Sequence, residues 1–188
     1  MDAAGPAHRR AFDEMRALGV QLIEVKLPQL PYEAIMLLMS AESAAYFEEL
    51  TLANVDEQID FGDLNPGSPA VYRRARLYSA VDYVQADRLR RLAMEQWHDL
   101  FTQVDMIAGP TYGRGGAVGA LSLTGHPGLT FRIGFEQAPT RRPGVDQTRK
   151  HRVTVNLTLH GRLFEEGRMF TLARALEEKL AVWSERPP

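Results

Sequence analysis

Two alternating stretches, "LTFRIGF" at residues 129–135 and "VTVNLTL" at residues 153–159, decide the fold of this 188-residue chain. Apolar residues occupy every second position in both stretches: Leu129, Phe131, Ile133 and Phe135, then Val153, Val155, Leu157 and Leu159. A period of two is typical of β-strands with one buried face. The intervening segment, 136–152, is polar and basic and has no helical period. We therefore predict two neighbouring antiparallel strands of one sheet, joined by the basic loop 136–152.

Segments on either side of these strands carry helical patterns. Apolar side chains recur at spacings of three and four residues, and this pattern predicts helices over residues 6–18, 32–50, 79–104 and 169–183. Ser79 and Asp82 have the spacing of a capping box at the start of the third helix. The expected buried stripes of the last two helices are Leu89, Leu92, Ala93, Trp97, Leu100, Phe101 and Val104, and Met169, Leu172, Ala173, Leu176, Leu180 and Trp183.

The remaining segments complete the predicted fold. "VQLIEVKLP" at 20–28 alternates like a strand, and "VDMIAGPT" at 104–111 is typical of a short apolar strand that ends at Pro110. Residues 54–69 are acidic and rich in turn formers, which favours a loop. Helices and strands are interspersed, so we expect a single α/β domain over residues 1–188, with helices packed on a sheet.

Composition excludes several classes of function. Basic and acidic residues nearly balance, at 22 and 24, so no overall charge recruits nucleic acid or an anionic membrane. The chain has no cysteine, which excludes disulfides, thiolate catalysis and zinc–sulfur sites. No apolar run reaches the length of a signal peptide or a membrane span. We expect a soluble, cytoplasmic protein that has neither nucleic acid nor a membrane among its partners.

The glycine-rich stretch "GPTYGRGGAVGALSLTGHPG" at 109–128 does not match the common catalytic loops. A Walker loop needs a Lys after its last Gly, and a dinucleotide loop needs a Gly where Val118 stands. A nucleophile elbow at Ser122 would need small residues two positions before and after the Ser, and Ala120 and Thr124 stand there rather than Gly, so the elbow is poorly matched. A Ser122 nucleophile with His126 as its base remains a minor alternative. The histidines have no metal-type spacing, so we expect no metal and no cofactor.

Four quoted segments together resemble the C-terminal half of the amidase signature family. They are "AFDEMRALGVQLIEVKLP", "SAVDYVQADRLRRLAMEQWHDLFTQVDMIAGPT", "LTGHPGLTFRIGF" and "HGRLFEEGRMFTLARALEE", and they span about residues 7–183 in the family's order and spacing. The resemblance implies an α/β fold with a mixed β-sheet surrounded by helices. It also implies carboxamide hydrolysis through a Ser–Ser–Lys triad with an oxyanion site of backbone amides.

The resemblance assigns no catalytic residue to this chain. The family's "GGSS"-type motif does not occur in the sequence, and none of Lys26, Lys150 and Lys179 matches the motif of the catalytic Lys. By resemblance, the glycine-rich stretch is a pair of loops that supports and lines a pocket for a small amide. We expect the substrate-binding residues to be Thr111, Ser122, Thr124 and Thr158.

Departures from the family pattern leave the amide substrate open. Ser122 stands where many members have Asn, and three polar residues replace a usual Pro, Gly and Gln before the "GR" turn: Thr154, Asn156 and Thr158. These three alternate, so they share one face of their strand.

Three functions follow as hypotheses from the sequence. The first is the C-terminal portion of an amidase-family hydrolase that is inactive alone. The second is a non-catalytic oligomerisation or binding module that complements a chain carrying the triad. The third is an independent hydrolase that uses Ser122. We also expect a homo-oligomer that buries a sheet edge or residues 32–47, because residues 35–39 form the apolar run "IMLLM".

Overall fold

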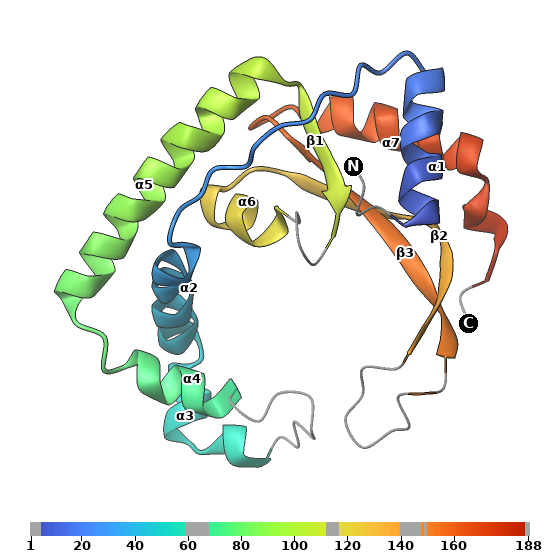
Figure 1. The fold of residues 1–188 in the computed structure, drawn as a ribbon. Coiled ribbons are helices and arrows are strands. Elements are labelled where there is room, and N and C mark those ends of the chain that lie inside the picture. The colour runs from blue at the N-terminus through green and yellow to red at the C-terminus, as the bar shows by residue number, and fades with distance from the viewer. Residues whose placement is uncertain (1–4, 59–67, 112–116, 140–147, 149, 187–188) are drawn as a thin grey trace.

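A three-stranded sheet organises one side of the molecule (Figure 1). The structure is a computed structural model that describes residues 5–58, 68–111, 117–139, 148 and 150–186. Strands β1 (Met106–Pro110), β2 (Gly128–Pro139) and β3 (Lys150–Gly161) lie in the order β1-β3-β2. The predicted antiparallel pairing of 129–135 with 153–159 is confirmed, with Phe131 opposite Leu157. Within the described residues the pairing is antiparallel throughout, rather than mixed.

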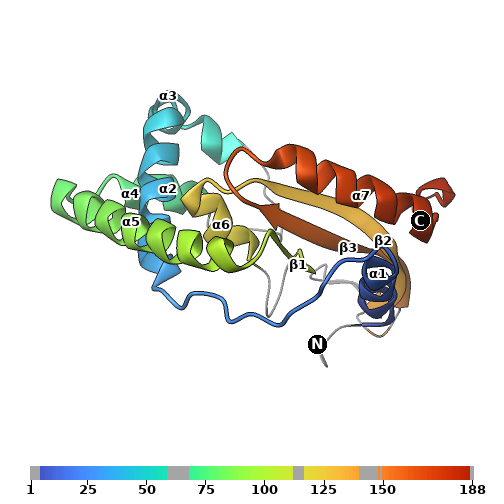
Figure 2. The same ribbon diagram turned by 90° about the horizontal axis from the view of Figure 1, so that it is seen from above.

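Helices α1 (Pro6–Ala17) and α7 (Glu166–Leu180) pack on one face of this sheet, as Figures 1 and 2 show. The core between them combines the apolar side chains of β2 and β3 with those of both helices and with Val182, which follows α7: Ala11, Met15, Phe131, Ile133, Val155, Leu157, Leu159, Ala173, Leu176, Leu180 and Val182. We call these residues the sheet core. Alternation in the strands explains this packing, because every second side chain points to the same face.

A second core lies on the helical side of the molecule (Figure 1). Here α2 (Tyr32–Tyr46), α5 (Ala80–Gln103) and α6 (Val118–Thr124) bury a common set of side chains with one residue of β1 and with Ala117, which precedes α6: Ile35, Leu38, Ala86, Ala93, Trp97, Leu100, Phe101, Ile107, Ala117 and Leu121. We call these residues the helical core. Helices α3 (Glu48–Leu52) and α4 (Ser68–Ala75) follow α2, and α4 also packs against it.

Several local predictions are confirmed. Ser79 Oγ accepts from the Asp82 amide at 3.1 Å, and Asp82 Oδ2 accepts from the Ser79 amide at 3.3 Å, which completes the capping box of α5. The predicted helices 6–18, 32–50 and 169–183 correspond to α1, α2 with α3, and α7. The α/β class is therefore confirmed as well.

The predicted strand at 20–28 was wrong. The segment has no regular secondary structure and runs as a connection from α1 to α2 (Figures 1 and 2). Its apolar side chains divide between the two cores: Val20 and Leu22 pack on the sheet core, and Val25 and Leu27 on the helical core. The alternation reflects side chains that point to two sides of the segment and pack on two cores. A β-strand also needs a neighbouring strand with which it can pair.

Three predicted loops hold more regular structure than expected. Strands β2 and β3 extend into the basic loop 136–152, of which 140–147 and 149 lie outside the described residues. The loop 54–69 contains a 3₁₀ turn at Val55–Gln58 and the start of α4, and 59–67 lie outside the described residues. The glycine-rich stretch contains α6, which ends at Gly125 with φ of 80°. A left-handed glycine is a common end of a helix.

Two residues of the predicted stripes are exposed instead. Leu92 of α5 is 49% exposed, and Trp183 is 68% exposed in the 3₁₀ turn Val182–Ser184 that follows α7. Helix α7 ends at Leu180, and the left-handed φ of 54° at the next residue, Ala181, changes the chain direction before Trp183. The apolar run of α2 is partly internal, because Ile35 and Leu38 are buried in the helical core while Met39 is exposed.

Arg162 connects the two sides of the molecule. Its Nε donates to the Phe101 carbonyl at 2.8 Å and its Nη2 donates to the Val104 carbonyl at 3.3 Å. Carbonyls at the C-terminal end of a helix lack partners within the helix, and a cation there also meets the negative end of the helix dipole. The residue after β3 therefore fixes the end of α5 against the sheet.

Candidate functional site

The face of the sheet opposite α1 and α7 is polar. In β3, Thr154, Asn156, Thr158 and His160 alternate with the residues of the sheet core, so they lie on this opposite face. Thr130 of β2 lies directly across from Thr158 in the register. The polar face therefore collects hydroxyl, amide and imidazole groups from two strands. It is our candidate site.

Three threonine hydroxyls meet at the centre of this face. Thr158 Oγ1 lies 2.8 Å from Thr111 Oγ1 and 2.8 Å from Thr130 Oγ1. The Thr158 side chain is only 2% exposed, Thr111 is half-buried just after β1, and Thr130 is exposed. The structure thus brings together two of the predicted binding residues, Thr111 and Thr158. Thr130 was not among the predicted binding residues, although the predicted hairpin already placed it opposite 153–159.

Thr124, a third predicted residue, belongs to a histidine cluster beside the threonines. Thr124 Oγ1 lies 2.8 Å from His126 Nδ1, and the His126 ring stacks on Phe101 with centroids 4.9 Å apart. His160 is buried nearby, and its Nδ1 has no hydrogen-bond partner among the residues that the structure describes. Gly128 is opposite His160, and a Cβ at Gly128 would come within 3.1 Å of the imidazole. Glycine at this position therefore allows β2 to lie directly against the buried ring.

Ser122, the fourth predicted residue, does not join these groups. It is exposed on α6, whereas Thr124 occupies the Nδ1 atom of His126. The alternative in which Ser122 uses His126 as its base receives no support from this arrangement. A nucleophile and its base need mutual hydrogen-bond geometry.

Lowering the pH from about 7 towards 5 is expected to destabilise the chain through His160. Burial lowers the pKa of His160 below its ordinary value, although a hydrogen bond with the Pro127 backbone partly offsets this effect. The unfolded chain therefore binds a proton at higher pH than the folded chain. The stability that the neutral His160 contributes is fully present above the ordinary histidine pKa of about 6.5. This contribution is lost as the pH falls from there towards the pKa of His160 in the folded chain.

Urea denaturation across this pH range will measure the effect. A His160→Gln variant should show a smaller loss of stability on acidification, and the exposed His151→Gln is the matched control. Some pH dependence should remain, because burial also lowers the pKa of His126. An acid loss of stability that is equal in all three proteins would contradict the assignment to His160.

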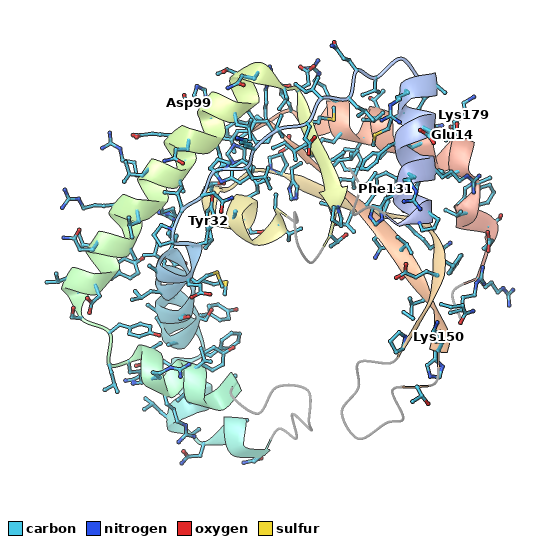
Figure 3. All side chains as sticks on the ribbon, in the orientation of Figure 1. Glu14, Tyr32, Asp99, Phe131, Lys150 and Lys179 are labelled. Atoms are coloured by element: carbon cyan, nitrogen blue, oxygen red, sulfur yellow. The ribbon has the colours of Figure 1, made fainter. Side chains whose placement is uncertain are left out.

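Two open depressions on the surface lie apart from the polar face. One, of about 450 Å³, is lined by the connection 23–28 and by Asp99 and other residues of α5. The other, of about 510 Å³, lies between Tyr32, Met36, Trp97 and Leu123. Figure 3 shows Tyr32 and Asp99 on the helical side, away from Phe131 in the sheet. None of the four predicted binding residues lines either depression.

The described part of the chain lacks two kinds of feature. Among these residues, no group of three or more His, Asp or Glu side chains is placed to hold a metal ion. Within the same residues, no helix combines the length and apolar character that crossing a membrane requires.

Similarity to known proteins extends over nearly the whole chain. No family model matches the sequence. A glutamyl-tRNA(Gln) amidotransferase subunit from Azoarcus sp. (strain BH72) is 27% identical over 215 residues, which is 94% of this chain and 42% of the relative. An amidase from Pseudomonas putida is 28% identical over 116 residues, which is 56% of this chain and 22% of the relative. The chain therefore spans less than half of the length of these relatives.

Solved structures share the fold. A crystal structure of an amidase superposes with a TM-score of 0.65 at 19% identity, covering 92% of this chain and 41% of that one. A protein of a "vestigial protein complex" related to the origins of an s-triazine catabolic enzyme gives a TM-score of 0.56 at 21% identity, covering 94% and 40%. At these identities the likeness concerns the fold.

Proposed function

We propose that this chain, which belongs to the amidase signature family, forms the non-catalytic wall of a carboxamide hydrolase. In this proposal the polar sheet face lines the amide site, with Thr111, Thr130 and Thr158 at its centre. A polypeptide segment that carries the family's Ser–Ser–Lys triad completes the site. No motif among the 188 residues matches that triad.

The observation that carries this proposal is a set of large apolar side chains that stay exposed among the described residues. They include Leu77 at 84%, Val81 at 68% and Phe164 at 93% exposure. Apolar surfaces of this kind favour association with further polypeptide. The match to about 40% of each relative's length supports the same view.

A partner chain has support from the relatives. One is named as a subunit of an amidotransferase, and one structural neighbour belongs to a complex. The alternative function, an oligomerisation or binding module, is favoured by the exposed Met39 and Tyr46 of α2. A homodimer through residues 32–47 would use these side chains, because Ile35 and Leu38 are already buried within the chain. Cytoplasmic location stays part of the proposal, to be checked by cell fractionation.

Purification from the native cells tests the proposal. We expect a tagged copy of the chain to be joined to, or to co-purify with, a polypeptide that contains a "GGSS"-type motif. The assembly should hydrolyse simple carboxamides, and Ser→Ala changes in that motif should abolish the activity. A chain that occurs alone, or an assembly whose hydrolysis is insensitive to those changes, would rule the proposal out. Light scattering of the isolated chain measures its molar mass and separately tests whether it forms the homodimer of the alternative function.

The isolated chain should hydrolyse no carboxamide. It matches neither the nucleophile, the bridging Ser nor the Lys of the family, and Ser122 is exposed on α6. Release of ammonia from benzamide and acetamide should therefore equal that of a Ser122→Ala control. Turnover that disappears in this control would instead establish an independent hydrolase with Ser122 as its nucleophile.

A further inference from the structure

The short segment that follows α7 is held against β2 by one arginine. Arg132 Nη2 donates to the carbonyls of Val182 at 2.7 Å and Glu185 at 2.9 Å, and the Trp183 carbonyl lies 3.4 Å from the same nitrogen. We call residues 182–185 the clasp segment, and Figure 1 shows this part of the chain, in red, beside β2. Because Arg132 binds main-chain oxygens, it fixes the path of the clasp segment rather than the position of one side chain.

Two side chains of the clasp segment make further contacts with the sheet. Val182 is buried in the sheet core, and Glu185 forms an ion pair with Arg152 of β3. The guanidinium carbons of Arg132 and Arg152 lie 5.0 and 3.7 Å from the ring centroid of Phe135, so one aromatic ring supports both cations. We call these three residues of β2 and β3 the arginine clamp. The clamp and the adjacent sheet core therefore recognise an apolar residue that is followed, three positions later, by a carboxylate.

A single strained residue connects the clasp segment to α7. Helix α7 ends at Leu180, and Ala181 then adopts a left-handed conformation with φ of 54° and ψ of 22°. This conformation is unfavourable for a residue with a side chain, because Cβ lies too close to the following carbonyl oxygen. The Ala181 amide still donates to the Glu177 carbonyl at 2.9 Å, which closes the helix. In this chain the clasp segment therefore reaches the clamp through a strained turn.

The docked clasp segment also leaves one donor of the clamp unsatisfied. Arg132 Nε is buried and has no hydrogen-bond partner among the residues that the structure describes. A buried donor without a partner destabilises the arrangement that contains it. Trp183 of the clasp segment is 68% exposed, although aromatic side chains are enriched at protein interfaces. The clasp segment is therefore complementary to the clamp, but its docking within one chain is not optimal.

We propose that the clasp segment exchanges between two copies of this chain, so that residues 182–185 of each copy occupy the arginine clamp of the other in a two-fold dimer. The structure defines the occupant, because the segment seated in the clamp is identical in a second copy. Exchange preserves the contacts of the clamp and lets Ala181 leave the left-handed conformation, and short strained hinges favour such exchange. Trp183 then lies beside the second copy.

The oligomeric state of the full 188-residue chain tests this inference. A segment tethered to its own clamp has an effective concentration on the order of 1 mM, so analytical ultracentrifugation should show monomers at micromolar concentration and dimers as the chain approaches that value. Ala181→Val should strengthen dimerisation about tenfold, because a β-branched residue is disfavoured further at positive φ. Ala181→Gly should weaken it about tenfold, because glycine adopts this φ without steric cost. Both variants keep the amide that donates to Glu177.

A pair of charge reversals shows whether the contact is made between copies. Arg152→Glu and Glu185→Arg each bring like charges together, both within one chain and between identical copies. When the two variants are mixed, both contacts between copies join opposite charges. The equimolar mixture should associate about tenfold more tightly than either variant alone, because two partly exposed ion pairs are restored. The exposed pair of Arg174 and Glu178 on α7 is the matched control, and mixing Arg174→Glu with Glu178→Arg should give no gain.

Three results would overturn the exchange. One is a chain whose association is equal in Ala181→Val and Ala181→Gly, and another is a mixture of the charge variants that associates no more tightly than its parents. The third is a dimer that Tyr46→Ser abolishes, because this outcome places the interface at residues 32–47 instead. Circular dichroism checks that each variant folds. Should Ala181→Val fail to fold, the mixture of Arg152→Glu with Glu185→Arg decides, since both substitutions change partly exposed side chains.

Discussion

Replacing Trp97 with alanine is expected to lower the free energy of unfolding by about 3–5 kcal/mol, the range for large aromatic truncations in cores. Trp97 is 1% exposed in the helical core, and its Nε1 donates to the Tyr32 hydroxyl at 3.0 Å. Tyr32 in turn donates to the Pro28 carbonyl at 3.1 Å. The substitution therefore leaves a cavity between α2 and α5 and removes the donor that joins them.

Urea denaturation followed by circular dichroism measures this loss. Leu92→Ala is the matched control, because it truncates an apolar residue of the same helix that is 49% exposed. It should change stability by no more than about 0.5 kcal/mol. Trp97→Phe should fall between the two, since it keeps an aromatic ring and loses the hydrogen bond. Similar losses for Trp97→Ala and Leu92→Ala would contradict the burial that the structure assigns to them.

The Leu157→Ala variant should lose about 2–5 kcal/mol of stability. Leu157 is fully buried in β3, the central strand, opposite Phe131 in β2 and Pro110 in β1. Strands flank it on both sides and helices α1 and α7 cover it, so the surroundings have little freedom to close the cavity. We expect a value in the upper part of the range.

Leu163→Ala provides the control for the sheet core. Leu163 follows β3 and is 41% exposed, so its truncation should cost less than about 1 kcal/mol. Hydrogen exchange of the β2 and β3 amides should become faster in Leu157→Ala and remain unchanged in Leu163→Ala. A loss below about 1 kcal/mol for Leu157→Ala would show that the sheet core does not depend on this side chain.

Local patterns predicted the elements whose partners lie close in the sequence. The hairpin of β2 and β3 followed from two alternating stretches with a single non-helical connection between them. The start of α5 followed from Ser79 and Asp82, because a capping box satisfies backbone amides within one helical turn. In both cases the stabilising contacts are encoded in neighbouring residues.

The candidate site could be predicted only in part. Thr158 was identified by its departure from the family pattern, and Thr111 by its place in the glycine-rich stretch. Predicting Thr130 as part of the site would have required the exact strand register, which places it opposite Thr158. His160 gave no sequence signal, because its significance comes from burial against Gly128 and from an Nδ1 atom that has no partner within the described part of the chain.

The sequence by itself determined the α/β class, the antiparallel hairpin and the capped start of α5, since periodicity and capping act over a few residues. Tertiary structure alone decided that 20–28 is a connection, although its alternation equals that of a strand. No described strand pairs with this segment, and its side chains pack on two different cores. The same holds for the threonine group, because β1, β2 and β3 bring its three hydroxyls together from positions far apart in the chain.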